Sequence, residues 1–271
     1  MIIGVDIGGT SIRAGLIRNG KVVKKSKKVS CIDVGKECFI GHLLECIEEV
    51  YVKGVKGIGL GCPGPANYNT GRLINPPNLK PLWGVNLKKI VKKKFRVKVE
   101  MDNDANCAAL AEIKKRKEKN FVVLTLGTGI GCGIVIDKKL YRGRGKASEL
   151  GFMIIDNSKS LQDLASGTAI TNRAQKKLGK KLLASELVKM RNVKAKKIIK
   201  ESAEYLGIGL ANIGNIFDPD VIVLTGGIKE AGNYYLNMAK KKMGEVCLLK
   251  SKVVWSQVKD AGIIGAGCLV E

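Results

Sequence analysis

The chain has 271 residues, 45% of them hydrophobic, which suffices for two modest lobes but includes no run near the ~20 apolar residues that span a bilayer. Its net charge of +24 comes mostly from lysines in helix-like stretches that apolar residues interrupt, a pattern typical of solvated helix faces. Aromatic residues make up only 5%, which leaves little for stacking bases and argues against a nucleic-acid partner.

The N-terminal part of the chain alternates strand-like and helix-like segments. Apolar residues 1–6 end in Asp6 before a glycine turn, and a second strand over 11–17 leads into a hairpin turn at Asn19-Gly20. The further elements expected before residue 112 are a helix over 39–52, a strand over 55–60, a helix over 87–95, a strand over 97–101 and a helix that begins near Ala105. Strands that alternate with helices predict α/β layers, and the strand-like start at Met1 favours the cytoplasm over secretion.

The opening pattern returns at residue 121. A strand over 121–126 precedes the turn Gly127-Thr128-Gly129, and a second strand over 131–136 leads into a hairpin turn at Asp137-Lys138. The remaining expected elements are helices over 165–178 and 195–217, a strand over 221–224 and a closely packed, small-residue helix over 261–269. Two such units about half a chain apart predict a duplicated architecture.

Three glycine turns follow three buried strands. They are Gly8-Gly9-Thr10, Gly127-Thr128-Gly129 and Gly226-Gly227. Glycine lets the backbone approach a ligand and direct successive N–H groups at phosphate oxygens, and α/β proteins bind ligands at the carboxyl ends of strands. The three turns together therefore predict a nucleotide site, although the chain has neither a G-x-x-x-x-G-K-[ST] loop nor the G-x-G-x-x-G spacing.

Carboxylates stand at the ends of two predicted strands. Asp6 precedes the first glycine turn, where it would contact Mg²⁺ through water or stabilise an Asx-type turn. Asp104, in Asp102-Asn103-Asp104, stands where a helix N-cap would go, and it would also suit a base that accepts a proton from an attacking hydroxyl. Phosphoryl transfer asks mainly for positioning, charge neutralisation and one such carboxylate, so the local sequence leaves both interpretations open.

The cysteines and the only histidine predict no metal centre. The eight cysteines lie at positions 31, 38, 46, 62, 107, 132, 247 and 268. They form no C-x-x-C pair, which argues against a thiolate zinc site and a disulfide scaffold, so we expect reduced, packed thiols. His42 falls in a helical pattern and is interpreted as structural, and a single histidine also argues against a Ser-His-Asp mechanism.

Nine segments, taken in order, carry a family resemblance. They are DIGGT at 6–10, GCPGP at 61–65, PNLKPLWGVNL at 77–87, DNDANCAALAE at 102–112, LGTGIGCGIV at 126–135, GKASELGF at 145–152, LASGTAI at 164–170, DPDVIVLTGGI at 218–228 and AGIIGAG at 261–267. With this set the chain resembles the sugar kinases of the ROK family (repressors, open reading frames and kinases) along nearly its full length. The resemblance implies two ribonuclease-H-like, actin-like ATPase lobes: 1–112 rejoined by a C-terminal helix over 260–271, and 113–259.

The resemblance also implies a role for each candidate site residue. The residues that would hold ATP phosphates are Gly8, Gly9, Thr10, Gly127, Thr128 and Gly129, and those that would lie by the adenosine are Gly226 and Gly227. Asp104 would deprotonate the sugar hydroxyl. The residues that would hydrogen-bond the sugar are Asn103 and Glu149, with Asn78 and Gln162 as further candidates.

The chain departs from the family's glucokinases in the part that would face the sugar. Phe152 stands where those proteins have a histidine that contacts the sugar and helps hold a structural zinc, and the Cys-rich zinc loop is missing. Gln162 stands in place of a glutamate. We therefore expect ATP and Mg²⁺ as cofactors, with Mg²⁺ bound mainly through ATP and Asp6 as its candidate contact, and we expect no zinc.

The sequence thus predicts a cytoplasmic, ATP-dependent kinase that acts on a primary hydroxyl of a hexose or hexose derivative. Its expected partners are a small-molecule sugar and ATP, with no membrane, while a homo-oligomer stays open. One alternative is a sugar-responsive regulator, although Met1 begins the first lobe and leaves no room for a helix-turn-helix module. The other is an ATPase or binding protein without sugar kinase activity, which Phe152 and Gln162 motivate.

Overall fold

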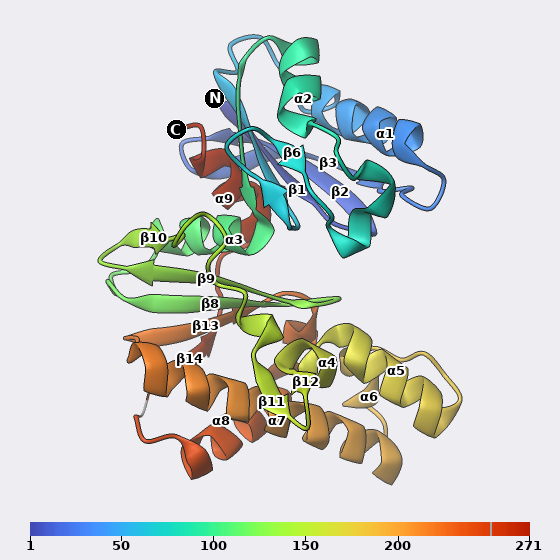
Figure 1. Cartoon of the computed structure of the whole chain (residues 1–271), viewed down its shortest axis with the longest axis vertical. Helices are drawn as coiled ribbons and strands as arrows, with labels where there is room; N and C mark the ends of the chain where they lie inside the picture. Colours follow the sequence, from blue (N-terminus) through green and yellow to red (C-terminus); the bar gives the residue numbers. More distant parts are fainter. Residues whose placement is uncertain (250) are drawn as a thin grey trace. The chain divides into compact units, whose positions relative to one another are not determined.

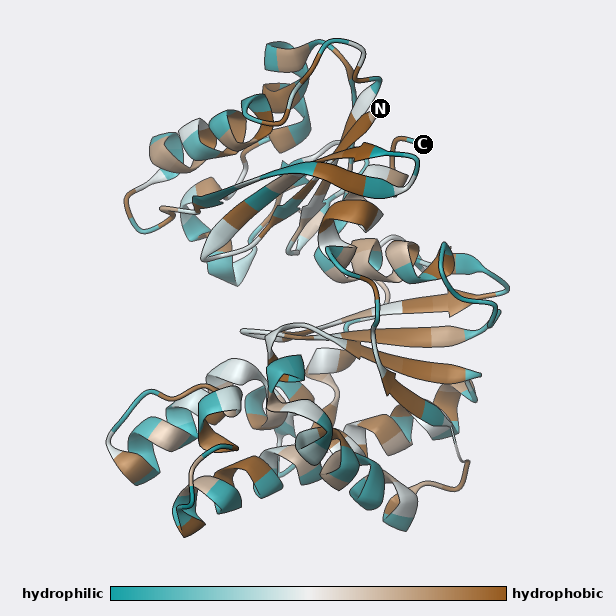
Figure 2. Cartoon of the chain, turned by 180° about the vertical axis from the view of Figure 1, so that it is seen from behind, coloured by the Kyte–Doolittle hydropathy of each residue, from teal (hydrophilic) through white to brown (hydrophobic). Residues whose placement is uncertain are grey.

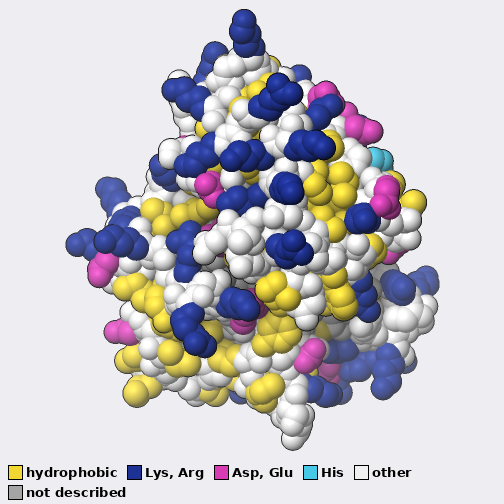
Figure 3. All heavy atoms as spheres, turned by 45° about the horizontal axis from the view of Figure 1, so that its top comes forward, with side chains coloured by type: hydrophobic (Ala, Val, Ile, Leu, Met, Phe, Trp, Pro, Cys, Tyr) yellow, Lys and Arg dark blue, Asp and Glu magenta, His cyan; other side chains and the backbone are white. Residues whose placement is uncertain are grey.

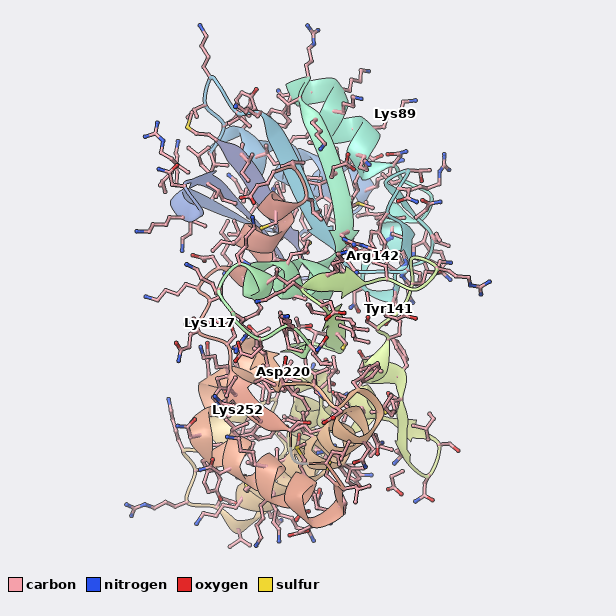
Figure 4. All side chains as sticks on the ribbon, turned by 90° about the vertical axis from the view of Figure 1, so that its left-hand side faces the viewer. Lys89, Lys117, Tyr141, Arg142, Asp220 and Lys252 are labelled. Carbon is pink, nitrogen blue, oxygen red and sulfur yellow. A yellow bond between two sulfur atoms is a disulfide. The ribbon has the colours of Figure 1, made fainter. Side chains whose placement is uncertain are left out.

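The computed structural model describes residues 1–249 and 251–271, and the chain folds into two compact units. The first unit consists of residues 1–117, 143–146 and 258–271, and the second consists of residues 118–142 and 147–257. Figure 4 labels Lys117 and Arg142, two of the positions at which the chain passes from one unit to the other. Each unit is described by itself below.

The first unit is built on a five-stranded sheet in the order β3-β2-β1-β4-β7. Its strands are β1 (Ile2–Ile7), β2 (Ser11–Arg18), β3 (Lys21–Val29), β4 (Gly57–Cys62) and β7 (Lys98–Asn103). β1, β4 and β7 are parallel, whereas β2 and β3 are antiparallel to their neighbours and form the hairpin predicted at Asn19-Gly20. The three parallel strands therefore bring their carboxyl ends to one edge, the edge at which α/β sheets bind ligands.

Helices cover both faces of the first sheet, as Figure 1 shows. These helices are α1 (Lys36–Glu48), α2 (Leu87–Phe95), α3 (Asp104–Ile113) and α9 (Ala261–Cys268). Apolar strand residues such as Leu60 share one core cluster with α1 and α2. On the other face α9 approaches so closely that a Cβ on Gly59 would lie 1.7 Å from the carbonyl oxygen of Ala266. The predicted close packing of a small-residue C-terminal helix is confirmed.

The second unit repeats this strand order as β10-β9-β8-β13-β14. Its strands are β8 (Phe121–Leu126), β9 (Ile130–Ile136), β10 (Lys139–Tyr141), β13 (Val221–Thr225) and β14 (Lys252–Trp255). β8 pairs antiparallel with β9 and parallel with β13, as β1 does with β2 and β4. The predicted α/β class and its duplication are therefore confirmed.

The helices of the second unit lie mainly against one face of its sheet. They are α4 (Leu161–Ala165), α5 (Gly167–Leu178), α6 (Ala184–Leu187), α7 (Val193–Phe217) and α8 (Gly232–Val246). Val122 and Leu124 of β8 share one core cluster with residues of all five. The helix predicted over 165–178 is α5, which begins two residues later than predicted because Ser166 is extended; it ends the separate helix α4 and caps α5.

Short elements complete the fold and carry part of the candidate site. They are β5 (Ala66–Asn67), β6 (Arg72–Leu73), η1 (Pro77–Leu82), η2 (Leu150–Phe152), β11 (Ile154–Asp156), β12 (Lys159–Ser160) and η3 (Gly227–Ala231). Figure 2 shows the strands of the second sheet as largely hydrophobic, and those of the first sheet, which includes the lysine-rich β3, and the outer helices as mixed. In the face drawn in Figure 3, Lys and Arg side chains are spread among apolar and uncharged atoms, the distribution expected of solvated helix faces.

No helix within the described ranges combines the length and apolarity that crossing a bilayer requires.

The prediction that all eight cysteines are reduced is wrong for two of them. Cys31 and Cys38 are joined by a disulfide, with their Cα atoms 6.1 Å apart. Cys31 follows β3 in a left-handed conformation and its carbonyl accepts a hydrogen bond from the N–H of Val34, so the chain turns back and brings α1 to it. The separation of seven residues gives no recognisable motif, which is why the sequence does not predict the pair. The remaining cysteines, all within the described residues, are free thiols.

Candidate active site

The carboxyl ends of β1, β4 and β7 bring distant polar residues together in the first unit. Asp6 is in register with Gly61, and Gly61 is in register with Asp102. Asn103 and Asp104 follow at the transition from β7 to α3. Parallel pairing therefore places the first glycine turn and the Asp102-Asn103-Asp104 segment at the same edge of the sheet.

Asn103, rather than Asp104, is the N-cap of α3. Its Oδ1 accepts hydrogen bonds from the N–H groups of Ala105 at 2.9 Å and Asn106 at 3.4 Å. Asp104 is the first helical residue, and its Oδ1 accepts a hydrogen bond from the N–H of Ala105 at 3.0 Å. The predicted cap is thus wrong by one residue, and the consequence is chemical: Asn103 satisfies the helix start, while the carboxylate of Asp104 lies at the positive end of the helix.

Two groups, one buried and one half-buried, hold this segment in place. The carboxylate of Asp102, which is 4% exposed, accepts hydrogen bonds from the N–H of Asn103 at 2.7 Å and Nδ2 of Asn106 at 2.9 Å. Nδ2 of Asn103 donates to the hydroxyl of Tyr68 at 3.3 Å. Burial raises the pKa of Tyr68, so its hydroxyl stays neutral. Tyr68 lies in the turn between β5 and β6, and no sequence signal singled it out.

The first glycine turn is held by the segment that follows β3. The N–H of Gly8 donates to the carbonyl of Ser11 at 2.9 Å, which closes the turn. Ser30 is buried, and its hydroxyl donates to the carbonyl of Gly9 at 2.5 Å while its N–H donates to that of Thr10 at 3.1 Å. A Cβ on Gly9 would lie 3.3 Å from Cβ of Asn78, so η1 places Asn78 beside this turn. The sequence predicted the turn and Asn78 but missed Ser30.

Asp6 lies where β1, β2 and α9 converge. Its Oδ2 accepts a hydrogen bond from the guanidinium of Arg13 at 2.5 Å, and a Cβ on Gly262 would lie 2.4 Å from the same oxygen. Burial raises the pKa of Asp6, and the charge and hydrogen bond of Arg13 oppose that shift. Among the described residues the carboxylate pairs with Arg13, so the Asx-type turn is not the arrangement found.

The second glycine turn, in the second unit, is held by Gln162. Oε1 of Gln162 accepts a hydrogen bond from the N–H of Ile130 at 3.0 Å, and a Cβ on Gly129 would lie 2.3 Å from the same oxygen. The turn itself is closed by the N–H of Gly127, which donates to the carbonyl of Gly129 at 3.0 Å. Gln162 therefore supports the turn, and its predicted contact with a sugar stays a prediction.

The N-terminus of α5 lies directly against this turn. The N–H of Gly167 donates to the carbonyl of Gly127 at 2.8 Å, and a Cβ on Gly167 would lie 2.7 Å from that oxygen. Ser166 caps the helix by accepting a hydrogen bond from the N–H of Ala169 at 3.2 Å. The positive end of a twelve-residue helix thus adjoins the turn, a local arrangement that suits anionic ligands.

The third glycine turn adjoins the end of β8. Gly226 has a positive φ of 98°, and a Cβ there would lie 2.5 Å from the carbonyl oxygen of Leu126. η3 begins at Gly227 and packs against α6. A cavity of about 190 Å³ opens between α6, α7 and α8, and its lining residues are Leu187, Val188, Lys196, Ile199 and Tyr234.

Glu149 stands at the start of η2, which packs on β9. A Cβ on Gly151 would lie 2.1 Å from the carbonyl oxygen of Ile130, so no larger residue fits between η2 and the strand that leaves the second glycine turn. Glu149 as a whole residue is exposed, but its carboxyl group is partly buried. This partial burial raises the pKa of the carboxyl. The charge of Glu149 adds to the effect of burial in raising the pKa of Cys132 on β9, which reflects how near the two groups are.

Two residues near Glu149 have unusual surroundings: Ser148 is buried and Phe152 is exposed. Ser148 has a left-handed φ of 79°, and its buried hydroxyl has no hydrogen-bond partner among the described residues. A strained backbone and an unpaired buried hydroxyl next to a candidate ligand residue are typical of functional segments. Phe152 is 57% exposed, which is unusual for a phenyl side chain. The sequence singled out Phe152 but not Ser148.

The predicted site residues therefore form two groups, one in each unit. The group in the first unit comprises Asp6, Gly8, Gly9, Thr10, Asn78, Asn103 and Asp104. The group in the second unit comprises Gly127, Thr128, Gly129, Glu149, Gln162, Gly226 and Gly227. Within each group, backbone register or direct contact links most members to a glycine turn.

Comparisons with known proteins identify the family of the chain. The sequence model of the ROK family matches residues 2–271. A glucokinase from Thermotoga maritima is 30% identical over 308 residues, which cover 100% of this chain and 97% of that protein. A xylose repressor from Caldicellulosiruptor bescii is 30% identical over 311 residues, which cover 99% of this chain and 77% of the repressor.

Solved structures share the fold along the whole chain. A ROK family glucokinase from Streptomyces griseus in complex with glucose and AMPPNP gives a TM-score of 0.89 at 26% identity, with 99% of this chain and 98% of that chain covered. A ROK hexokinase from Thermus thermophilus gives a TM-score of 0.82 at 28% identity, with 99% and 97% covered. These likenesses confirm the predicted actin-like ATPase fold, and with the match over residues 2–271 they establish that the chain belongs to the ROK family.

Proposed function

We propose that the chain is an ATP-dependent kinase that phosphorylates a primary hydroxyl of a hexose or hexose derivative, with Asp104 as the general base. The observation that carries this proposal is that the helix cap and the carboxylate at the start of α3 belong to two different residues. Asn103 caps the helix, and Asp104, one residue later, places its carboxylate at the edge where three parallel strands end. A carboxylate that only capped a helix would occupy the N-cap position itself.

The proposed reaction needs one proton acceptor and an in-line displacement. Asp104 accepts the proton of the sugar hydroxyl as the hydroxyl oxygen bonds to the γ-phosphorus of ATP. The bond from that phosphorus to the β,γ-bridging oxygen breaks, and ADP leaves with the electron pair. Asn103 supports this step because one amide hydrogen is given to Tyr68, which orients the group, and the second hydrogen can donate to a sugar hydroxyl.

The nucleotide would be held by backbone groups rather than by a lysine loop. Backbone N–H groups of the turns that begin at Gly8 and Gly127 would bind phosphate oxygens, helped in the second unit by the N-terminus of α5. The cavity between α6, α7 and α8 supports an adenosine position near Gly226-Gly227, since α6 packs against η3 and Leu187, Val188 and Ile199 offer an apolar lining for a flat base.

Mg²⁺, when bound with ATP, supplies neutralisation of the charge on the β- and γ-phosphates. Asp6 fits the role of an indirect ligand only in part. Its Oδ2 is held by Arg13, so a water-mediated contact with the ion would use Oδ1. Arg13 lies on β2, the strand that follows the first glycine turn. Its exposed guanidinium carries a positive charge, which attracts anionic ligands.

The decisive test is sugar-dependent release of ADP. The full chain is incubated with Mg²⁺-ATP and, separately, glucose, mannose, fructose, allose, N-acetylglucosamine and N-acetylmannosamine. We expect one of them to stimulate ADP release strongly, with the stimulation lost in Asp104→Asn. Stimulation that persists in Asp104→Asn would contradict the mechanism, and ATP hydrolysis that no sugar changes would favour an ATPase without sugar kinase activity.

A sugar-responsive regulator is the second candidate, because a xylose repressor is 30% identical to this chain, as a glucokinase is, although the match covers 77% of the repressor and 97% of the glucokinase. The two candidates separate in one experiment. Calorimetric titration of each sugar, with and without the nucleotide analogue AMPPNP, reports binding independently of turnover. A sugar that binds with no ADP release under saturating Mg²⁺-ATP would favour the regulator.

A further inference from the structure

A cluster of metal-ligating side chains lies in the first unit outside the proposed catalytic residues. Sγ of Cys31, Sγ of Cys38 and a ring nitrogen of His42 lie within 4.8 Å of one another, and all three residues are half-buried. Cys31 follows β3, whereas the other two belong to α1. Their four-residue spacing places Cys38 and His42 on one face of that helix. Two sulfurs and an imidazole are the ligands that thiophilic divalent metals prefer.

The hydrogen bond of His42 prepares the imidazole for a metal. Nδ1 lies 2.8 Å from the carbonyl oxygen of Val29, and a carbonyl can only accept, so Nδ1 carries the proton. The lone pair is therefore on Nε2, the nitrogen left to bind a metal. A metal-bound histidine almost always donates its other ring N–H to a carbonyl or carboxylate in this way.

The two sulfurs are close enough to share one tetrahedral ion once they are reduced. A tetrahedral ion with Zn–S bonds of 2.3 Å separates two sulfurs by about 3.8 Å. That separation lies inside the 4.8 Å span of the three ligand atoms, and the Cα atoms, 6.1 Å apart, allow it through rotation of the side chains alone. The disulfide found here and a metal bridge thus use the same pair of residues.

We propose that Cys31, Cys38 and His42 form a zinc site that oxidation of the two cysteines to the disulfide closes. Reduction by a dithiol converts the dithiol to its disulfide and passes two electrons and two protons to Cys31 and Cys38. Zn²⁺ then displaces one proton from each thiol and binds two thiolates and Nε2 of His42, with water in the fourth position. This set shares no residue with the Cys-rich loop that the chain lacks, and it replaces the expectation of no zinc.

The site is linked by one residue to the first glycine turn. Ser30 immediately precedes Cys31, and it makes the two hydrogen bonds that hold the carbonyls of Gly9 and Thr10. A metal or a disulfide at Cys31 therefore fixes the backbone that positions Ser30. An effect of zinc on nucleotide affinity follows from this link and rests on the proposed function, whereas zinc binding itself does not.

Cobalt spectroscopy tests the site without reference to activity. The full chain is reduced with a phosphine, freed of metal and titrated with Co²⁺, whose thiolate complexes absorb in the near ultraviolet. We expect a thiolate-to-cobalt band that saturates at one equivalent and is displaced by Zn²⁺, and no band in the disulfide form. Loss of an outer hydrogen bond costs a metal site about 10–100-fold in affinity, so loss of a thiolate in Cys38→Ser should cost more than about 100-fold.

Matched variants and a protection experiment decide the outcome. Cys247→Ser, which removes a half-buried free thiol of the second unit, should bind Co²⁺ as the unaltered chain does. Zn²⁺ should also protect Cys31 and Cys38, but not Cys247, from alkylation of the unaltered, reduced chain, as read by mass spectrometry. No thiolate band in the reduced chain, equal Zn²⁺ affinity in Cys38→Ser, or alkylation of both cysteines at full rate would each overturn the proposal.

Discussion

The two sheets share one strand order, yet the first glycine turn of each is built from different chemistry. In the first unit the residue two positions before the turn is Asp6. Burial raises the pKa of its carboxyl, and the nearby Arg13 lowers it. In the second unit the equivalent residue is Thr125, which is neutral. The first turn is held by the hydroxyl of Ser30, and the second by the amide of Gln162 and the N-terminus of α5.

This difference shows that the two halves of a duplicated fold can share a backbone arrangement and differ in the side chains added to it. Strand order alone places a glycine turn at the end of β1 and of β8, so both turns can present backbone N–H groups to phosphates. Three aspartates, Asp6, Asp102 and Asp104, then gather at the ends of parallel strands in the first unit, whereas the candidate carboxylate of the second unit, Glu149, stands at the start of η2. Under the proposed function, proton transfer and contact with a cation would belong to the first unit, and binding of phosphates by uncharged backbone groups would belong to both turns.

The largest expected effect is that of Asp104→Asn. If the first unit supplies the base, kcat should fall by about 10²–10⁴-fold, the usual contribution of a positioned general base. Binding of AMPPNP, measured by calorimetry, should change little because the glycine turns are untouched. Asp137→Asn, in an exposed hairpin turn of the second unit, is the control and should leave kcat unchanged. A comparable loss in both variants would erase the contrast between the units.

The next effect is that of Asp6→Asn, which makes the first turn neutral like the second. We expect kcat/KM to fall by about 10–100-fold, less than the loss of a direct transition-state contact, with a higher requirement for Mg²⁺. Because the pKa of Asp6 is raised, its contribution to stability is present below its unfolded pKa and lost as pH rises through its folded pKa. Urea unfolding at neutral pH should therefore detect no destabilisation by Asp6→Asn, and a large one would indicate a structural carboxylate instead.

The arrangement of strands could be predicted because their patterns are local. Buried runs that end in glycine turns identified β1, β8 and β13, and the repeat identified the duplication. Helix ends were less predictable, since α1 begins at Lys36 and ends at Glu48 rather than spanning 39–52. α6, α8 and β14 were not predicted, because α6 is only four residues long and the apolar residues of α8 and β14 stand beside lysines. These elements are placed by packing on η3, α7 and β13.

The candidate site was predictable only where a residue is part of a motif. Asp104 and the glycine turns have sequence signals, but Tyr68 and Ser30 act through contacts with Asn103 and Gly9 that only the tertiary fold creates. Cys31 and Cys38 belong to the same class, since a turn after β3 brings them together. The motif resemblance therefore predicts the chemistry of the site, whereas the residues that support it require the structure.

A smaller effect is expected from Glu149 and depends on pH. Partial burial raises the pKa of this carboxyl, so it takes up a proton at a higher pH than an ordinary glutamate does. Protonation weakens it as an acceptor for sugar hydroxyls, so KM for the sugar should rise as pH falls through the raised pKa. Glu149→Gln should show a KM about tenfold higher than that of the unaltered chain at neutral pH and flat across this range, given about 1.5 kcal/mol for a hydrogen bond to a charged group. A pH-dependent KM in the variant would assign the titration to another residue.

The smallest effect is expected from Gln162→Glu, which restores the residue common in the family's glucokinases. The turn needs only an acceptor for the N–H of Ile130, and a carboxylate oxygen supplies one. The equilibrium constant of unfolding and kcat should therefore each change by less than about twofold. Gln162→Met has a similar volume but no acceptor, and it should destabilise the second unit by about 1–3 kcal/mol because the N–H of Ile130 loses its partner. Urea unfolding and sugar KM separate the two roles. If Gln162→Glu changes the preferred sugar while Gln162→Met only destabilises, the side chain both supports the turn and contacts the substrate.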